Sequence, residues 1–97
     1  EGLVLHEGGI IVDANRRIEE MSGYSREDLV GSDFYKMLEP DAQRIVSERV
    51  MVDDGIPYQV KARAKDGSLL ELEVLGRDIP YKGSTLRVAS VRDIGER

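Results

Sequence analysis

The sequence predicts an α+β domain: one five-stranded antiparallel sheet, short helices, and one longer helix inserted between the second and third strands. Two β-branched-rich runs flank a Gly-Gly pair within the first twelve residues, and after residue 57 the apolar residues recur with the period of a strand. Between these regions the apolar spacing is helical. Strands, then helices, then strands are typical of α+β folds. The 97 residues suffice for one hydrophobic core and are too few for two.

The chain begins with a predicted hairpin. Its apolar runs at 3–6 and 10–12 are separated by Glu7, Gly8 and Gly9, which favour a tight turn. Asn15 then stands at the N-cap of a short helix that ends at Gly23, a residue suited to a left-handed C-cap.

Two more short helical segments and the long helix follow. The stretch 25–28 has the Ser-x-x-acid form of a capping box and starts a helix that stops at Gly31, and residues 33–38 can form one further turn. Pro40 suits the first turn of the longer helix, because its missing N–H would have no partner there. One face of that helix, interrupted by Arg49, should be buried, and comprises Ala42, Ile45, Val46 and Val50.

The last part of the chain should complete the sheet. Residues 58–65 alternate apolar and polar side chains, turn at Asp66 and Gly67, and continue into a strand with Leu70, Leu72 and Val74 on one face. The stretch 78–84, which contains Pro80 and Gly83, is predicted to be a loop, and 85–91 the last strand.

Composition excludes several classes of function. The net charge is −5, from 14 basic and 19 acidic residues, and the basic residues are scattered, so neither nucleic acid nor a membrane surface is an expected partner. There is no cysteine, which removes disulfides, thiolate metal sites and thiol nucleophiles. One histidine and serines at caps and turns assemble no nucleophile with a base, so we expect neither an enzyme nor a metal site. The chain carries no apolar segment of transmembrane or signal length and is compatible with a reducing cytoplasm.

Four segments, in order and at matching separations, resemble the PAS domains of prokaryotic signalling proteins. They are residues 9–15 (GIIVDAN), 21–31 (MSGYSREDLVG), 65–68 (KDGS) and 91–94 (VRDI). The resemblance implies a single PAS domain over residues 1–97, excised from a larger signalling protein. Such a domain would be a sensory input module that binds a small ligand or partner and signals to an attached effector, such as a histidine kinase or a cyclic-dinucleotide enzyme. The alternative is a ligand-free dimerisation scaffold.

The resemblance also implies a cavity between the inner sheet face and the helices. His6 on the first strand, Arg49 on the long helix and Arg87 on the last strand are its candidate polar contacts, although each can instead be an edge or surface residue. The candidate apolar lining, which could equally fill the space as core, comprises Phe34, Met37, Ile45, Leu72, Val74 and Val91. No cofactor is predicted: cysteine-dependent flavin photochemistry is excluded, and the long helix offers no histidine to haem.

The first strand carries apolar residues on both faces. Leu3 and Leu5 would face outward, and Val88 joins them if the inward register of the last strand holds. A contiguous apolar patch usually meets a partner, so we expect a homodimer through these residues, or coverage by flanking helices of the same chain. Asp93 and Ile94 match the family's signal-exit motif. Gly95 replaces its usual threonine, and Asp93 could cap an outgoing helix answered by Glu96.

Overall fold

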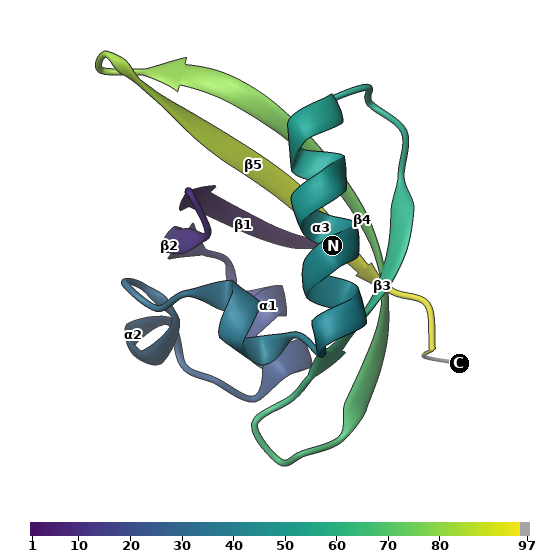
Figure 1. The fold of residues 1–97 in the computed structure, drawn as a ribbon. Helices are drawn as coiled ribbons and strands as arrows, with labels where there is room; N and C mark the ends of the chain where they lie inside the picture. The colour runs from purple at the N-terminus through teal and green to yellow at the C-terminus, as the bar shows by residue number, and fades with distance from the viewer. Residues whose placement is uncertain (96–97) are drawn as a thin grey trace.

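The computed structural model describes residues 1–95 and contains the five-stranded antiparallel sheet that the sequence predicts, in the order β2-β1-β5-β4-β3 (Figure 1). The strands are β1 (Gly2–Glu7), β2 (Ile10–Ala14), β3 (Tyr58–Arg63), β4 (Leu69–Tyr81) and β5 (Ser84–Asp93). The first and last strands of the sequence are therefore neighbours within the sheet, and the pairing of β1 with β5 joins the two ends of the domain.

All helical segments lie between β2 and β3 in the sequence: α1 (Arg16–Ser22), α2 (Arg26–Leu29), the 3₁₀ turn η1 (Phe34–Met37) and α3 (Pro40–Val52). The predicted caps are present. Asn15 accepts a hydrogen bond from the N–H of Ile18 at α1, and Ser25 accepts one from the N–H of Asp28 at α2. Gly23 ends α1 with a left-handed φ of 81°.

The long helix α3 begins with Pro40 at its first position and ends at Asp53, which itself adopts a left-handed φ of 48°. The N–H of Asp53 donates to the carbonyl of Arg49 at 3.3 Å, which closes the last turn. This conformation turns the chain away from the helix axis and toward β3, and it brings the Asp53 side chain next to β5.

The predicted loop at 78–84 is wrong, because β4 continues to Tyr81 and pairs with β5 up to Tyr81↔Ser84. Only Lys82 and Gly83, with φ values of 47° and 78°, form the turn. Pro80 is tolerated in this strand because β3 pairs only with residues 69–74 of β4, so β4 is an edge strand at Pro80. The end of this hairpin projects beyond the rest of the sheet (Figure 1).

The core lies between the sheet and the helices that cover one of its faces. Its most deeply buried side chain is Leu29 of α2, which is 1% exposed. The other buried residues include Ile11 from β2, Ile18 from α1, Val46 from α3 and Val74 from β4. Among residues 1–95, no helix is long and apolar enough to cross a membrane.

Candidate functional site

The core is not completely filled. A cavity of about 140 Å³ lies between the inner face of the sheet and the helices. On the helix side its walls include Ile18, Leu29, Val46 and Val50. On the sheet side they include Val4, Val60 and Ala89, residues that the strand period places on the same inner face. The cavity is thus mainly apolar. Its polar or charged lining residues are His6, Ser22, Tyr58, Arg63 and Arg87.

The structure brings most of the predicted pocket residues to this cavity. Those that line it are His6, Phe34, Met37, Leu72, Val74, Arg87 and Val91. Their contact with a ligand stays a prediction, because the same side chains also form the wall of the core. Two other predicted residues, Ile45 and Arg49, are not among the lining.

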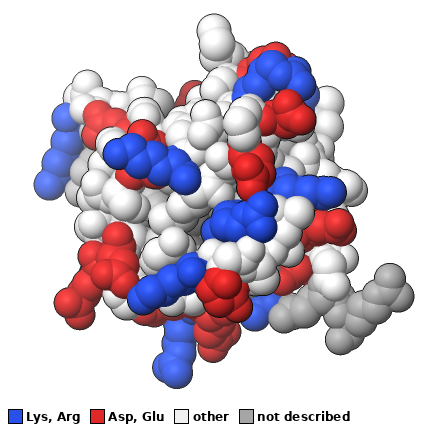
Figure 2. All heavy atoms as spheres, turned by 60° about the horizontal axis from the view of Figure 1, so that its bottom comes forward, with Lys and Arg blue, Asp and Glu red and all other residues white. Residues whose placement is uncertain are grey.

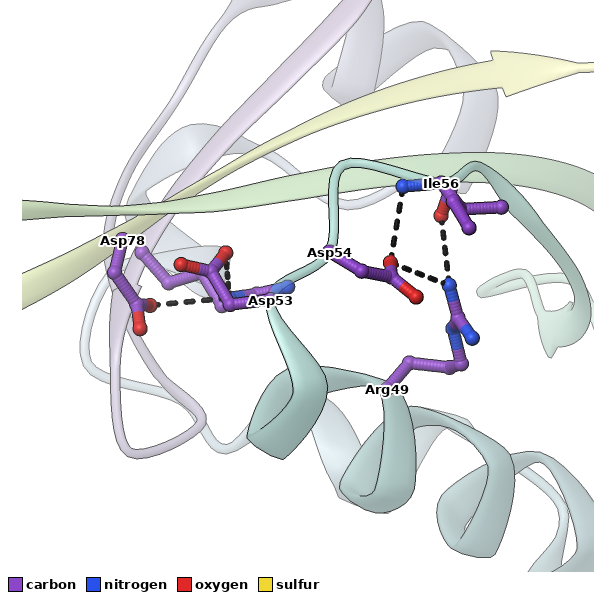
Figure 3. Close-up of polar contacts among 6 residues, drawn as sticks. Arg49, Asp53, Asp54, Ile56 and Asp78 are labelled. Atoms are coloured by element: carbon purple, nitrogen blue, oxygen red, sulfur yellow. Dashed lines mark hydrogen bonds and ion pairs between the residues drawn. The ribbon is translucent and has the colours of Figure 1, made fainter.

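Ile45 and Arg49 were expected to line the cavity, and the structure places both of them outside its lining. The helix turns Ala42, Val46 and Val50 toward the core, which leaves Ile45 half-buried at the side. Arg49 lies near the C-terminal end of α3, and its Nη2 donates to Asp54 Oδ1 at 2.8 Å and to the carbonyl of Ile56 at 3.0 Å (Figure 3).

Arg49 therefore organises the connection between α3 and β3. Asp54 Oδ1 also accepts from the N–H of Ile56, so the three residues form a closed network (Figure 3). The guanidinium carbon of Arg49 lies 5.6 Å from the ring centre of Tyr58, within the range of a cation–π contact. Among the side chains of residues 1–95, Arg49 Nε is the only fully buried polar atom without a hydrogen-bond partner.

Arg87 is a buried cation held by two carboxylates from different elements. The residue is 5% exposed, and its Nη1 donates to Asp53 Oδ1 at 3.0 Å and to Asp78 Oδ1 at 3.1 Å. Asp53 follows α3 and Asp78 lies on β4, and the two converge on this one nitrogen (Figure 3). A buried guanidinium requires such partners, because an unpaired charge away from water is strongly destabilising.

Space for the Arg87 side chain is provided by Gly76 of β4. A Cβ atom at Gly76 would lie 2.6 Å from Arg87 Nε and 2.7 Å from Nη2, closer than non-bonded atoms approach. Gly76, Asp53 and Asp78 were not predicted from the sequence. The available signal was a glycine within the alternating pattern of β4, which often marks the close approach of another group.

His6 lies beside Arg87 in the β1–β5 ladder and is 4% exposed. Its Nδ1 accepts a hydrogen bond from the N–H of Gly9 at 3.2 Å, and its ring meets Phe34 edge to face with 4.6 Å between the ring centres. Burial, and secondly the charge of Arg87, lower the pKa of His6 from 6.5 to about 4, with Asp78 opposing. The imidazole is therefore neutral at pH 7.

Gly9 supports this arrangement at the turn between β1 and β2. Its φ of 93° is in the left-handed region, and a Cβ there would lie 2.8 Å from ring atoms of Tyr35. At the same polar end of the cavity, burial raises the pKa of the Tyr58 phenol above its usual value, so this hydroxyl stays protonated and able to donate.

The outer face of the sheet carries the three predicted interface residues. Leu5 and Val88 are direct neighbours in the β1–β5 ladder, and Leu3 is 40% exposed. Two apolar residues of β4 that were not predicted, Leu75 and Ile79, lie on the same face, on either side of Arg77, which pairs with Val88. We call Leu3, Leu5, Leu75, Ile79 and Val88 the outer patch.

The exit motif ends the last strand. Asp93 Oδ1 accepts from the N–H of Gly95 at 3.0 Å, and the N–H of Ile94 donates to the carbonyl of Glu71 at 2.9 Å. The first contact is local to the end of β5, and the second fixes this end against β4. The predicted answering residue, Glu96, lies outside the described residues.

Charge on the surface is mixed in sign. On the face shown in Figure 2, basic and acidic side chains are interspersed, and no region of one sign dominates. Arg92 and Glu73, for example, pair at 2.6 Å. Among residues 1–95, no three His, Asp or Glu side chains cluster in a way that could hold a metal ion.

Comparison with known proteins gives one consistent result. A family model described as PAS domain matches residues 1–96. Similar solved structures include the PAS domain of an HTR-like protein from Haloarcula marismortui, with 20% identity and a TM-score of 0.82, covering 96% of this chain and 80% of that one. A PAS domain from a two-component sensor histidine kinase has 16% identity and a TM-score of 0.83, covering 96% and 84%.

A third similar structure is the PAS domain, in complex with ethanol, of a LuxR-family transcriptional regulator from Burkholderia thailandensis. It has 25% identity and a TM-score of 0.77, and the alignment covers 98% of this chain and 89% of that one. No curated protein matches the sequence.

Proposed function

The chain belongs to the PAS-domain family, and we propose that it is a sensory input module that binds a small molecule and relays a conformational signal to an attached effector domain. The effector classes that fit are a histidine kinase or a cyclic-dinucleotide enzyme. A similar domain belongs to a two-component sensor histidine kinase, which supports the first of these. We propose no catalytic role, because PAS domains generally serve as input modules.

The observation that carries this proposal is the position of β5 between the cavity and the exit motif. Arg87, Ala89 and Val91 of this strand line the cavity, and the same strand ends at Asp93. A molecule that displaces these side chains therefore acts on the element that leads out of the domain. Ile94 and the carbonyl of Glu71 hold this end in one position, which a signal would have to change.

A small molecule is favoured as the signal because the cavity lies between the sheet and the helices, is largely apolar and has few polar lining residues. The ethanol complex of the similar Burkholderia domain supports the view that this fold admits small molecules. The cysteine-dependent photochemistry of flavin-binding relatives has no residue here, since the chain contains no cysteine.

Native mass spectrometry tests the sensory proposal. The protein is purified from its own host under non-denaturing conditions and weighed before and after denaturation. A mass excess that disappears on denaturation supports a bound ligand. A chain mass without excess, from protein that is folded and has been kept free of displacing additives, counts against sensing by a resident small molecule.

A second candidate function, a dimerisation scaffold without a ligand, is favoured by the outer patch. Its residues lie on the sheet face that the helices of the described chain leave uncovered, and Leu3 and Leu75 are each 40% exposed. Apolar side chains gathered on one face usually meet a partner. We propose a second copy of this domain as that partner, with flanking helices of the same chain as the competing occupant.

A further inference from the structure

The polar end of the cavity presents a hydrogen-bond donor without a partner. His6 Nδ1 accepts from Gly9, so the proton of the neutral ring is on Nε2. Nε2 has no hydrogen-bond partner among the described residues. It is also not fully buried, because Arg49 Nε is the only fully buried side-chain nitrogen or oxygen of these residues that lacks a partner. Because His6 also lines the cavity, a molecule there can approach this N–H. The contacts with Gly9 and Phe34 fix the ring before any molecule arrives.

The charge of Arg87 is already more than balanced. Its side chain is 6% exposed and pairs with both Asp53 and Asp78, so the three groups together carry a net charge of −1. An anionic ligand would meet this net negative charge and would have to displace a carboxylate to pair with the guanidinium. A neutral ligand with an acceptor atom meets neither cost.

The size of the cavity limits the ligand further. Its volume of about 140 Å³ is close to the ~150 Å³ of an apolar cavity that accepts benzene, and below the ~300 Å³ at which pockets for drug-sized molecules begin. The apolar walls favour a molecule that is apolar over most of its surface. Size, charge and the free donor thus point to the same chemical class.

We propose that the cavity selects a small neutral molecule, apolar except for one hydrogen-bond acceptor, and that the acceptor receives the Nε2–H of His6. This assignment rests on the proposed sensory function and specifies the ligand class of the same site. It makes His6 the residue that determines specificity and gives Arg87 a structural role.

Three probes of matched size and shape test the selection: cumene without an acceptor, acetophenone with a neutral acceptor, and benzoate with an anionic one. Dissociation constants are measured by NMR titration of the isotope-labelled domain. We expect the ratio of the cumene to the acetophenone dissociation constant to be about fivefold higher in the parent than in His6→Leu, the contribution of one hydrogen bond, because the cost of removing each probe from water cancels in that comparison. Benzoate should bind more weakly than acetophenone. The same ratio in the parent and in His6→Leu, or tightest binding of benzoate, overturns the assignment.

Two variants locate the donor. His6→Leu keeps an apolar wall and removes the N–H, so acetophenone should bind about fivefold more weakly relative to cumene than it does in the parent. Tyr58→Phe removes the neighbouring hydroxyl from the lining and should leave the preference unchanged. The opposite pattern, with the preference lost in Tyr58→Phe and kept in His6→Leu, overturns the role of His6.

A measurement on the unmodified protein covers the case in which His6→Leu does not fold. The chain has one histidine, so the Nε2 resonance is unambiguous, and acetophenone but not cumene should shift it. If no probe binds while native mass spectrometry finds a host molecule, the ligand class is wrong and the sensory function stands. If neither binding is found, both fail.

Discussion

His6 shows how a single buried side chain makes stability depend on pH. The unfolded chain takes up a proton near the ordinary pKa of 6.5, whereas the folded protein resists protonation down to about 4. The folded-state pKa is the lower one, so this contribution is fully present above pH 6.5 and is lost as the pH falls toward 4. We expect the free energy of unfolding to decrease by up to about 3 kcal/mol across this window, measured by urea denaturation at each pH.

The matched control is His6→Gln, which is polar and does not titrate. Its unfolding free energy should lack this component between pH 6.5 and 4. Asp13 and Asp66, whose pKa values are lowered by hydrogen bonds from Arg26 and Ser68 respectively, lose their contributions only below the ordinary carboxyl pKa of 3.8. An identical slope in the variant and the parent would show that other groups cause it.

Gly76 gives a second prediction at this scale. In Gly76→Ala the new Cβ would meet the Arg87 guanidinium, so Arg87 must leave its position between Asp53 and Asp78. We expect a loss of about 1–3 kcal/mol of unfolding free energy, the usual cost of disturbing a buried charged hydrogen bond. Urea denaturation measures it.

Gly95→Ala is the control for this substitution, since a Cβ there finds its nearest neighbour at an ordinary 3.5 Å. It should change the stability by less than about 0.5 kcal/mol. Equal stability of Gly76→Ala and its parent would contradict the assigned packing.

The same residues explain why the polar part of the site was only partly predictable. Strand alternation, together with the register that the family resemblance implies, put His6 and Arg87 on the inner face. Helical spacing alone did not reveal that Arg49 pairs with Asp54, because that contact depends on how the chain leaves α3. Asp53 and Asp78 are separated by 25 positions in the sequence and meet only through the fold.

At the scale of elements, Arg87 joins three of them: its own strand β5, the end of α3 and β4. Asp53→Asn should retain the left-handed conformation, which asparagine tolerates, while it weakens the ion pair. We expect a loss of about 1–2 kcal/mol for this variant. The double variant Asp53→Asn, Asp78→Asn leaves the cation buried without a carboxylate and should lose about 3–5 kcal/mol.

A double-mutant cycle over Asp53 and Asp78, with urea denaturation of all four proteins, measures whether the two carboxylates act together. Asp41→Asn, on the exposed first turn of α3, controls for the change in total charge. Additive losses, with the double variant no worse than the sum of the single ones, would mean that each carboxylate acts independently on Arg87.

Element prediction failed at one place for a related reason. Pro80 and Gly83 together favoured a loop at 78–84, yet only Lys82 and Gly83 are needed for the turn. Whether a proline interrupts a strand depends on whether a neighbour needs its N–H, and β3 ends its pairing with β4 before Pro80. The caps at Asn15 and Ser25 were predictable because they depend on residues only three apart.

At the scale of the whole molecule, the outer patch gives a prediction about assembly. Leu5→Asp introduces a charge next to Val88 at the centre of the patch, where burial against a second subunit would be costly. We expect the parent protein to sediment as a dimer and the variant as a monomer in analytical ultracentrifugation, with unchanged circular dichroism.

Met51→Asp, on an 87% exposed residue of α3 outside the outer patch, adds the same single negative charge and serves as the control. A dimer that persists in Leu5→Asp would remove this face from the interface. A parent that is already monomeric would favour coverage of the patch by flanking helices of the same chain.

The ten residues of β5 form two sets that face different surroundings and can change independently. Side chains alternate along the strand. Arg87, Ala89 and Val91 therefore line the cavity, whereas Val88 lies on the outer face of the sheet. Under the proposed function, substitutions in the inner set would change the ligand that the domain accepts, and substitutions in the outer set would change its partner. Related domains should accordingly drift at these two sets of positions at different rates.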